Sequence, residues 1–134
     1  MQKGLIVHTL VTNDKGEILI LQRSKTDDVL PEYWDIPGGT LKDGEDPAIG
    51  ATRETKEEAG IDIINPKLFF HKSKVDIEKN KQFVTLIFLA QCSDINIVLD
   101  PEEHQDYAWI QPSEILNYKT VEYLSDCISA YLEL

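Results

Sequence analysis

The segment that most constrains the fold is a stretch of thirteen residues bounded by helix-terminating signals. Asp46 can cap the first turn, Pro47 suits the first helical position, and Gly60 is the residue type that most often ends a helix. We therefore predict a helix between Asp46 and Gly60, about 20 Å long at ~1.5 Å per residue. The other segments are mostly β-rich, so this helix is expected to be one layer of a domain that also contains a sheet.

Apolar, partly β-branched runs separated by polar or charged turns predict strands on both sides of this helix. The expected strands are residues 4–12, 17–23, 62–75, 82–92 and 107–110. The first two should form a hairpin, whereas residues 24–37 and 93–106 are expected to be loops. Pro112 should start a short helix, and the helical spacing of Val121, Leu124, Ile128 and Leu132 predicts a last helix packed on the core. This order predicts a single α/β domain over residues 1–134 with a mixed β-sheet.

The charge balance excludes some classes of partner. The 134 residues include 13 basic and 24 acidic side chains, a formal net charge of −11, which disfavours binding to nucleic-acid polymers. Small phosphorylated ligands stay possible because divalent cations can bridge carboxylates and phosphates. The apolar run from Leu5 to Val11 is too short to span a membrane and lacks a signal-cleavage pattern. We expect a cytoplasmic protein, a monomer or homodimer, with Cys92 and Cys127 as small buried thiols.

Three glutamates lie on one side of the predicted helix. At 100° per residue, Glu57 and Glu58 fall about 60° and 40° to either side of Glu54. Like charges at these spacings destabilise a helix by a few tenths of a kcal/mol per pair. Glu57 and Glu58 also lie near the C-terminal end, where the helix dipole disfavours negative charge. The arrangement opposes helix stability in two ways, so it calls for a compensating interaction.

A solvated acidic face, partly neutralised by Arg53 and Lys56, is the simplest explanation for these glutamates. However, the same arc continues through Gly50, with Ala51 beside it, and such small residues allow another segment to approach closely. Mg²⁺ takes oxygen ligands and commonly uses one or two carboxylates together with substrate phosphates and waters. The pattern therefore favours a metal site.

At these residues the chain resembles the Nudix hydrolase family. The family signature is met at the required spacing by Gly39, Glu45, Arg53, Glu54, Glu57, Glu58, Gly60 and Ile61. Thr55 stands where the family has an aliphatic residue, and the approach Trp34-Asp35-Ile36-Pro37-Gly38 also looks like that of the family. The match covers residues 39–61 and is specific because many positions are fixed at once. It implies an α/β/α sandwich and a Mg²⁺-dependent hydrolase, with Mn²⁺ as a possible substitute, that cleaves a nucleoside diphosphate linked to another moiety.

The resemblance also implies roles for the matching residues. Glu57 and Glu58 look like direct Mg²⁺ ligands, with the Gly38 carbonyl as a possible third. Glu54 would be a metal ligand or the general base. Glu45 would be a peripheral metal ligand or a structural anchor. The metal would neutralise phosphate charge and lower the pKa of the attacking water.

Charged residues in and near the motif are further candidates. Arg53 would orient the glutamates by charge-assisted hydrogen bonds. Some family members use a further loop glutamate, and Glu102, Glu103 and His104 are candidates here, of which we favour Glu103 as catalytic. The alternative is a solvated acidic loop. Arg23 is a candidate phosphate-binding cation, with an ordinary surface ion pair as the alternative.

Aromatic residues supply candidates for binding a nucleobase. Tyr33, Trp34 and Phe83 could stack on a base, although buried aromatic residues more often belong to the core. His8 and His71 are expected to lie in strands as packed residues.

The substrate is inferred by elimination. Certain Nudix subgroups carry a proline or tyrosine beyond the motif that marks hydrolases of ADP-ribose or dinucleoside polyphosphates, whereas this chain has Asp76-Ile77-Glu78-Lys79 there. The leading hypothesis is hydrolysis of a nucleoside triphosphate, with oxidised triphosphates included, to the monophosphate and pyrophosphate. The alternatives are hydrolysis of ADP-ribose, a nucleotide sugar or another diphosphate metabolite, a relative of isopentenyl diphosphate isomerase, and a module that senses nucleotides without cleaving them.

Overall fold

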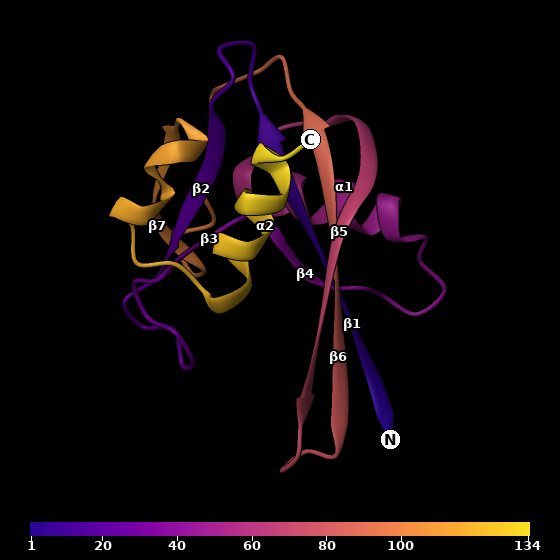
Figure 1. The fold of residues 1–134 in the computed structure, drawn as a ribbon. Helices are drawn as coiled ribbons and strands as arrows, with labels where there is room; N and C mark the ends of the chain where they lie inside the picture. The colour runs from indigo at the N-terminus through magenta and orange to yellow at the C-terminus, as the bar shows by residue number, and fades with distance from the viewer.

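The computed structural model describes all 134 residues and has a mixed seven-stranded sheet with helices on both faces (Figure 1). The elements in chain order are β1 Gln2–Thr12, β2 Ile18–Arg23, β3 Trp34–Asp35, β4 Gly38–Thr40, α1 Pro47–Ala59, β5 Ile64–Asp76, β6 Lys81–Gln91, β7 His104–Ile110, the 3₁₀ helix η1 Pro112–Asn117 and α2 Glu122–Leu132. The strand order is β3-β2-β1-β6-β5, with β4 paired to β1 and β7 paired to β2. Only the central β1–β6 pair is parallel.

The first two strands separate soon after their turn, and this separation creates room for the site. Their Cα pairing is at Thr12 and Ile18, next to the turn. Beyond that point β3 pairs with β2, and the chain then crosses at Pro37 so that β4 pairs with β1. The amide of Thr9 donates to the Pro37 carbonyl at 2.9 Å, which fixes the crossing. The hairpin is therefore confirmed only next to its turn, and the expected loop over residues 24–37 contains a strand.

The two helices cover opposite faces of the sheet. Ala51 of α1 packs with Val7 and Phe88, and the C-terminal end of α1 adds Ala59 to a second apolar cluster. On the other face, Leu124 of α2 belongs to a cluster of 11 buried residues from strands, helices and the connections between them. The expected α/β/α arrangement with a mixed sheet is confirmed.

The signals at the ends of α1 are confirmed in detail. The Asp46 carboxylate accepts the amide hydrogen of Ala48 at 3.1 Å, and Pro47 occupies the first turn. Gly60 ends the helix in the left-handed conformation, with φ of 72°. Neither α1 nor α2 combines the length and the apolar character that a membrane-spanning helix requires.

Other boundaries differ from the sequence prediction. β7 begins at His104, three residues earlier than expected, because residues 104–106 pair with the end of β2. Leu132 is 58% exposed, so the expected apolar stripe of α2 ends at Ile128. Both cysteines are buried, as expected.

Candidate active site

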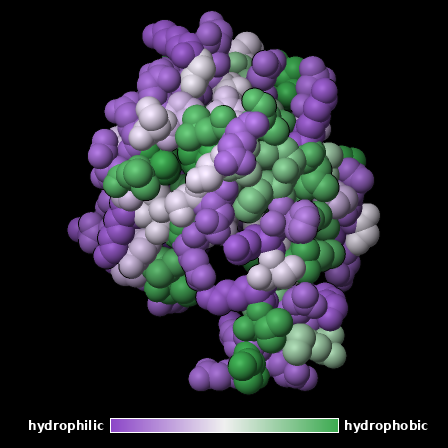
Figure 2. All heavy atoms as spheres, viewed as in Figure 1, coloured by the Kyte–Doolittle hydropathy of each residue, from purple (hydrophilic) through white to green (hydrophobic).

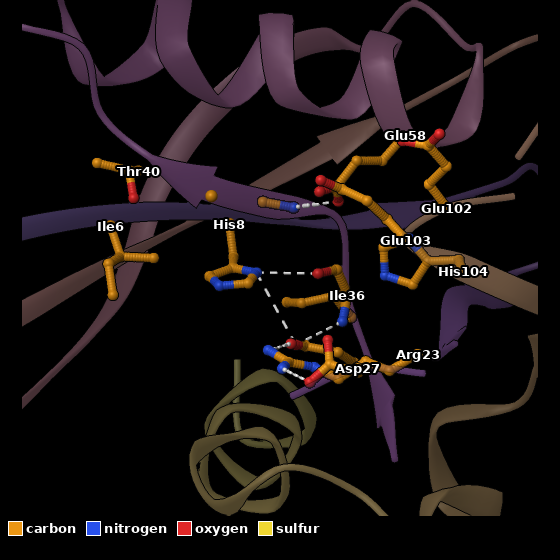
Figure 3. A pocket seen from close by; sticks show the side chains of 13 residues that line it. Ile6, His8, Arg23, Asp27, Ile36, Thr40, Glu58, Glu102, Glu103 and His104 are labelled. Carbon is orange, nitrogen blue, oxygen red and sulfur yellow. Dashed lines mark hydrogen bonds and ion pairs between the residues drawn. The ribbon is translucent and has the colours of Figure 1, made fainter. Parts of the chain in front are cut away.

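A polar cavity of about 340 Å³ lies where β1 and β2 separate (Figure 3). Its lining comes from β1, β2, the β2–β3 loop, β3, the crossing after it, β4, α1, the segment before β7 and the first residue of β7. The lining residues are Ile6, His8, Arg23, Asp27, Asp35, Ile36, Gly38, Gly39, Thr40, Glu58, Glu102, Glu103 and His104. Five of these carry a carboxyl group and one carries a guanidinium, so the cavity is strongly acidic.

Glu58 is the most perturbed acid in the cavity. Its side chain projects from the last turn of α1, and its Oε1 accepts the amide hydrogen of Gly38 at 3.0 Å. Burial raises the pKa of Glu58 to about 10, assisted by a hydrogen bond with Glu103 and by repulsion from Glu103 and Glu54. A carboxyl group in this position favours either a proton or a bound cation.

Arg53 organises the other acidic residues of the motif. Its Nε and Nη2 donate to the two oxygens of Glu45 at 2.8 and 2.9 Å. Its Nη1 donates to Glu54 at 2.9 Å and reaches Glu57 at 3.3 Å. The Arg53 guanidinium lowers the pKa of Glu45 to about 2, with help from the Lys42 amide, despite the opposing effect of desolvation. Because both Glu45 oxygens are engaged, the geometry favours the anchor alternative for Glu45.

Two glycines make the close approach between α1 and the loop possible. A Cβ on Gly39 would lie 2.8 Å from the carboxylate of Glu54, so any larger residue would displace that carboxylate from its present position. A Cβ on Gly50 would lie 2.6 Å from Leu41 and 2.9 Å from Glu45. The small residues of the arc therefore accommodate another segment, as the sequence indicated.

Asp35 is the centre of a buried polar network at the inner end of the cavity. It accepts hydrogen bonds from Nη2 of Arg23 at 3.2 Å and from the hydroxyl of Tyr123 on α2. His8 Nδ1 lies 3.9 Å from Asp35 and 2.9 Å from the Ile36 carbonyl oxygen. Arg23 also pairs with Asp27 at 3.4 Å. Two aspartates thus hold Arg23 at the cavity wall. Because one of them, Asp35, is buried, these contacts differ from the ordinary surface ion pair considered above.

Glu103 and His104 lie at the opposite wall, close to Glu58 (Figure 3). The Glu103 carbonyl accepts the Ser24 amide hydrogen at 2.9 Å, and its amide donates to the Asp100 carbonyl at 3.0 Å. These bonds fix the backbone just before β7. Burial lowers the pKa of His104, against the opposing effect of nearby carboxylates. Ligand atoms of Glu58, Glu103 and His104 all lie within 4.8 Å of one another, and this set of oxygen and nitrogen donors fits a divalent cation.

Several predicted residues lie elsewhere. Glu57 does not line the cavity, and its side chain is 56% exposed beside Arg53. Trp34 packs edge-on against Tyr118, 5.2 Å between ring centroids, and belongs to the core periphery. Phe83 pairs with Gly4 near the beginning of β1 and lies outside the cavity.

Of the remaining aromatic and histidine residues predicted from the sequence, Tyr33 and His71 also lie outside the cavity. Tyr33 is covered by the ammonium of Lys119, 4.4 Å from the ring centroid, and does not line the cavity. His71 is exposed, so the expectation that it is packed is wrong, whereas His8 is buried.

The β5–β6 hairpin ends in a protruding tip with apolar side chains, where Val75 and Ile77 are exposed (Figure 2).

The sequence analysis did not single out three groups that the fold brings to this region: Asp35, Tyr123 and Asp27. Asp35 was noted only as part of the segment before the motif. Its burial at 3% exposure follows from β3 pairing inside the gap, which no local pattern signals.

Comparisons with known proteins agree on one family. The family model described as the NUDIX domain matches residues 2–131. The nucleoside triphosphatase NudI of Escherichia coli K12 is 32% identical over 126 residues, which cover 88% of this chain and 89% of that protein.

Solved structures share the fold. The MutT protein from Methanosarcina mazei Go1 has a TM-score of 0.85 at 26% identity, covering 98% of this chain and 94% of that chain. The NUDIX domain of Shewanella oneidensis NrtR, solved with ADP ribose, has a TM-score of 0.81 at 17% identity, covering 99% of this chain and 88% of that chain.

Proposed function

Because this chain belongs to the NUDIX domain family, we propose that it is a Mg²⁺-dependent pyrophosphohydrolase of nucleoside triphosphates, oxidised ones included. The products would be the nucleoside monophosphate and pyrophosphate. The observation that supports this most is the acidic cavity beside the glutamate motif of α1, where Glu58 is buried against other carboxylates.

The charge of the cavity supports the requirement for a metal. A triphosphate would meet five carboxyl groups and only one guanidinium, which Asp27 and Asp35 already neutralise. Such a cavity repels an anion unless cations lie between the two. A bound divalent cation would neutralise phosphate charge and lower the pKa of the attacking water. Glu58 would hold that cation, with Glu57 and the Gly38 carbonyl as further ligands.

The chain's own residues would divide the remaining work. A carboxylate, which we assign to Glu54, would take a proton from the water as its oxygen attacks phosphorus and pyrophosphate leaves. Arg53 would hold Glu54 in place through the 2.9 Å bond, and Glu45 would anchor Arg53 to the loop. Arg23 would contact a substrate phosphate from the inner wall, where Asp35 fixes its direction.

The choice of a triphosphate is supported by the relative NudI, which is named a nucleoside triphosphatase. ADP-ribose, nucleotide sugars and other diphosphate metabolites remain test substrates. A sensing module that binds nucleotide without cleaving it is the competing function, and the full set of motif glutamates argues for the enzyme.

A product-resolved screen tests this proposal. Purified protein is incubated with nucleoside triphosphates, 8-oxo-dGTP, ADP-ribose and nucleotide sugars, with Mg²⁺ or with excess EDTA, and the products are separated by chromatography. We expect monophosphate and pyrophosphate from a triphosphate, no turnover in EDTA, and recovery with Mg²⁺ or Mn²⁺. The matched control is Glu78→Gln, an exposed acid in the distant β5–β6 turn, which should keep full activity.

Two outcomes would overturn the proposal. Full activity in excess chelator would exclude a metal requirement for hydrolysis. Tight nucleotide binding without any turnover across the screen would establish the sensing module instead.

A further inference from the structure

His104 is a buried histidine with an unsatisfied nitrogen. The residue is 7% exposed, and its Nδ1 is buried without any hydrogen-bond partner. Most buried polar side-chain atoms in proteins have a partner, so an orphaned one points to a missing water, ion or ligand. The cavity reaches this side chain directly, because His104 is one of its lining residues.

The fold brings His104 to the same wall as two carboxylates. Strand alternation would send the side chains of neighbouring residues 103 and 104 to opposite faces. Here Glu103 ends the preceding loop, and the ladder between β2 and β7 is irregular at Gln22 and Arg23, opposite His104. Such irregularities re-aim side chains next to active sites. Both side chains consequently face Glu58 (Figure 3).

The distances suit a shared cation. One ligand atom from each of Glu58, Glu103 and His104 lies within 4.8 Å of the others. Two ligands on opposite sides of a cation, each at ~2.1 Å, are ~4.2 Å apart, so small side-chain rotations suffice. We propose that His104 supplies a nitrogen ligand to the divalent cation held between Glu58 and Glu103.

A nitrogen ligand has a consequence for metal choice. Imidazole binds Mn²⁺, Co²⁺ and Zn²⁺ better than it binds Mg²⁺, which prefers oxygen. The site should therefore bind these metals more tightly relative to Mg²⁺ than an all-oxygen site would. This inference rests on the proposed function for the presence of a metal site, and it adds the identity of one ligand and the direction of metal preference.

The other histidines serve as controls. His8 also lines the cavity, but its Nδ1 already contacts the Ile36 carbonyl oxygen at 2.9 Å. His71 is exposed on β5, outside the cavity, and is the neutral control for loss of an imidazole. The three variants His104→Gln, His8→Gln and His71→Gln each remove one imidazole and keep a polar side chain.

The experiment uses Mn²⁺ as the probe. Pulsed EPR of the Mn²⁺-loaded wild-type protein should show modulation from a directly bound ¹⁴N nucleus, without need of any variant. His104→Gln should abolish this modulation and weaken Mn²⁺ binding at least about tenfold, measured by titration of the free Mn²⁺ signal, while Mg²⁺ binding changes much less. His71→Gln should behave as wild type, and circular dichroism checks that each variant is folded.

The outcomes separate the two proposals. Absence of ¹⁴N modulation in wild type, or its survival in folded His104→Gln, would overturn the ligand assignment even if the enzyme hydrolyses triphosphates. Loss of the signal in His8→Gln but not in His104→Gln would overturn the proposal and show that His8 is the nitrogen ligand. A ¹⁴N signal that His104→Gln removes would support the inference even if the screen finds no turnover.

Discussion

Glu58→Gln should stabilise the metal-free protein at neutral pH, although Glu58 lies in the proposed catalytic centre. Glu58 has its pKa raised from the ordinary 4.5 to about 10. The folded protein therefore keeps a proton that the unfolded chain releases above pH 4.5, and stability falls as the pH rises between these two values. Glutamine needs no proton: its oxygen can accept the Gly38 amide hydrogen, and its amide can donate to Glu103.

The size of the effect follows from this pKa. Each pH unit above 4.5 costs the wild type ~1.4 kcal/mol of stability, so the difference reaches about 3 kcal/mol at pH 7 as an upper bound. Relaxation of the cavity reduces this value, and we expect a gain of about 1–3 kcal/mol for Glu58→Gln. The gain should shrink to near zero at pH 4.5. Saturating Mn²⁺ should make the wild type the more stable of the two, because the wild type holds the ion through Glu58 and Glu58→Gln loses this ligand.

Urea unfolding in EDTA at pH 4.5, 6, 7 and 8 measures this difference, with Glu78→Gln as the exposed-acid control. Hydrolysis by Glu58→Gln should be lost in the same preparations. The reasoning is refuted if Glu58→Gln is less stable than wild type at pH 7 to 8, or if the difference between them does not depend on pH.

Three further predictions concern neighbouring groups. Arg53→Ala should lower kcat by about ten- to a hundredfold with little change in KM, because Arg53 acts through the glutamates; a pure KM effect in steady-state assays would place it on the substrate. Glu54→Gln should fold normally, keep Mn²⁺ affinity and slow turnover ~10²–10⁴-fold. If Glu103→Gln loses kcat at saturating metal while Glu54→Gln keeps it, Glu103 is the base. Tyr123→Phe should cost about 1–3 kcal/mol in urea unfolding, since it removes a donor to buried Asp35; an unchanged midpoint would show that this hydrogen bond contributes nothing.

The helix and its acidic face could be predicted because their signals are local. Asp46, Pro47 and Gly60 specify the ends of α1 through backbone groups within a few residues, and the structure reproduces both ends. The spacing of the glutamates follows from helix geometry alone. The family follows from the same short segment, which fixes residue types at many positions.

The surroundings of Glu58 were decided only by tertiary structure. Its neighbours Gly38 and Glu103 lie 20 and 45 positions away, and no sequence period relates them. The burial that raises its pKa appears only when β4 lies over α1. A sequence can show that a glutamate is on a helix face, but its protonation depends on what covers that face.

The prediction that His104 lies in a loop failed for a similar reason. Residues 93–106 are rich in polar and acidic groups, which favours a loop, yet pairing with β2 extends β7 back to His104. Phe83 was proposed as an aromatic residue that could stack on a base, but strand pairing places it opposite Gly4, outside the cavity. The sequence by itself determined the helix, its carboxylates and the family. The contacts between strands distant in sequence decided which side chains surround those carboxylates, because loop closure and strand pairing bring together residues that no local pattern connects.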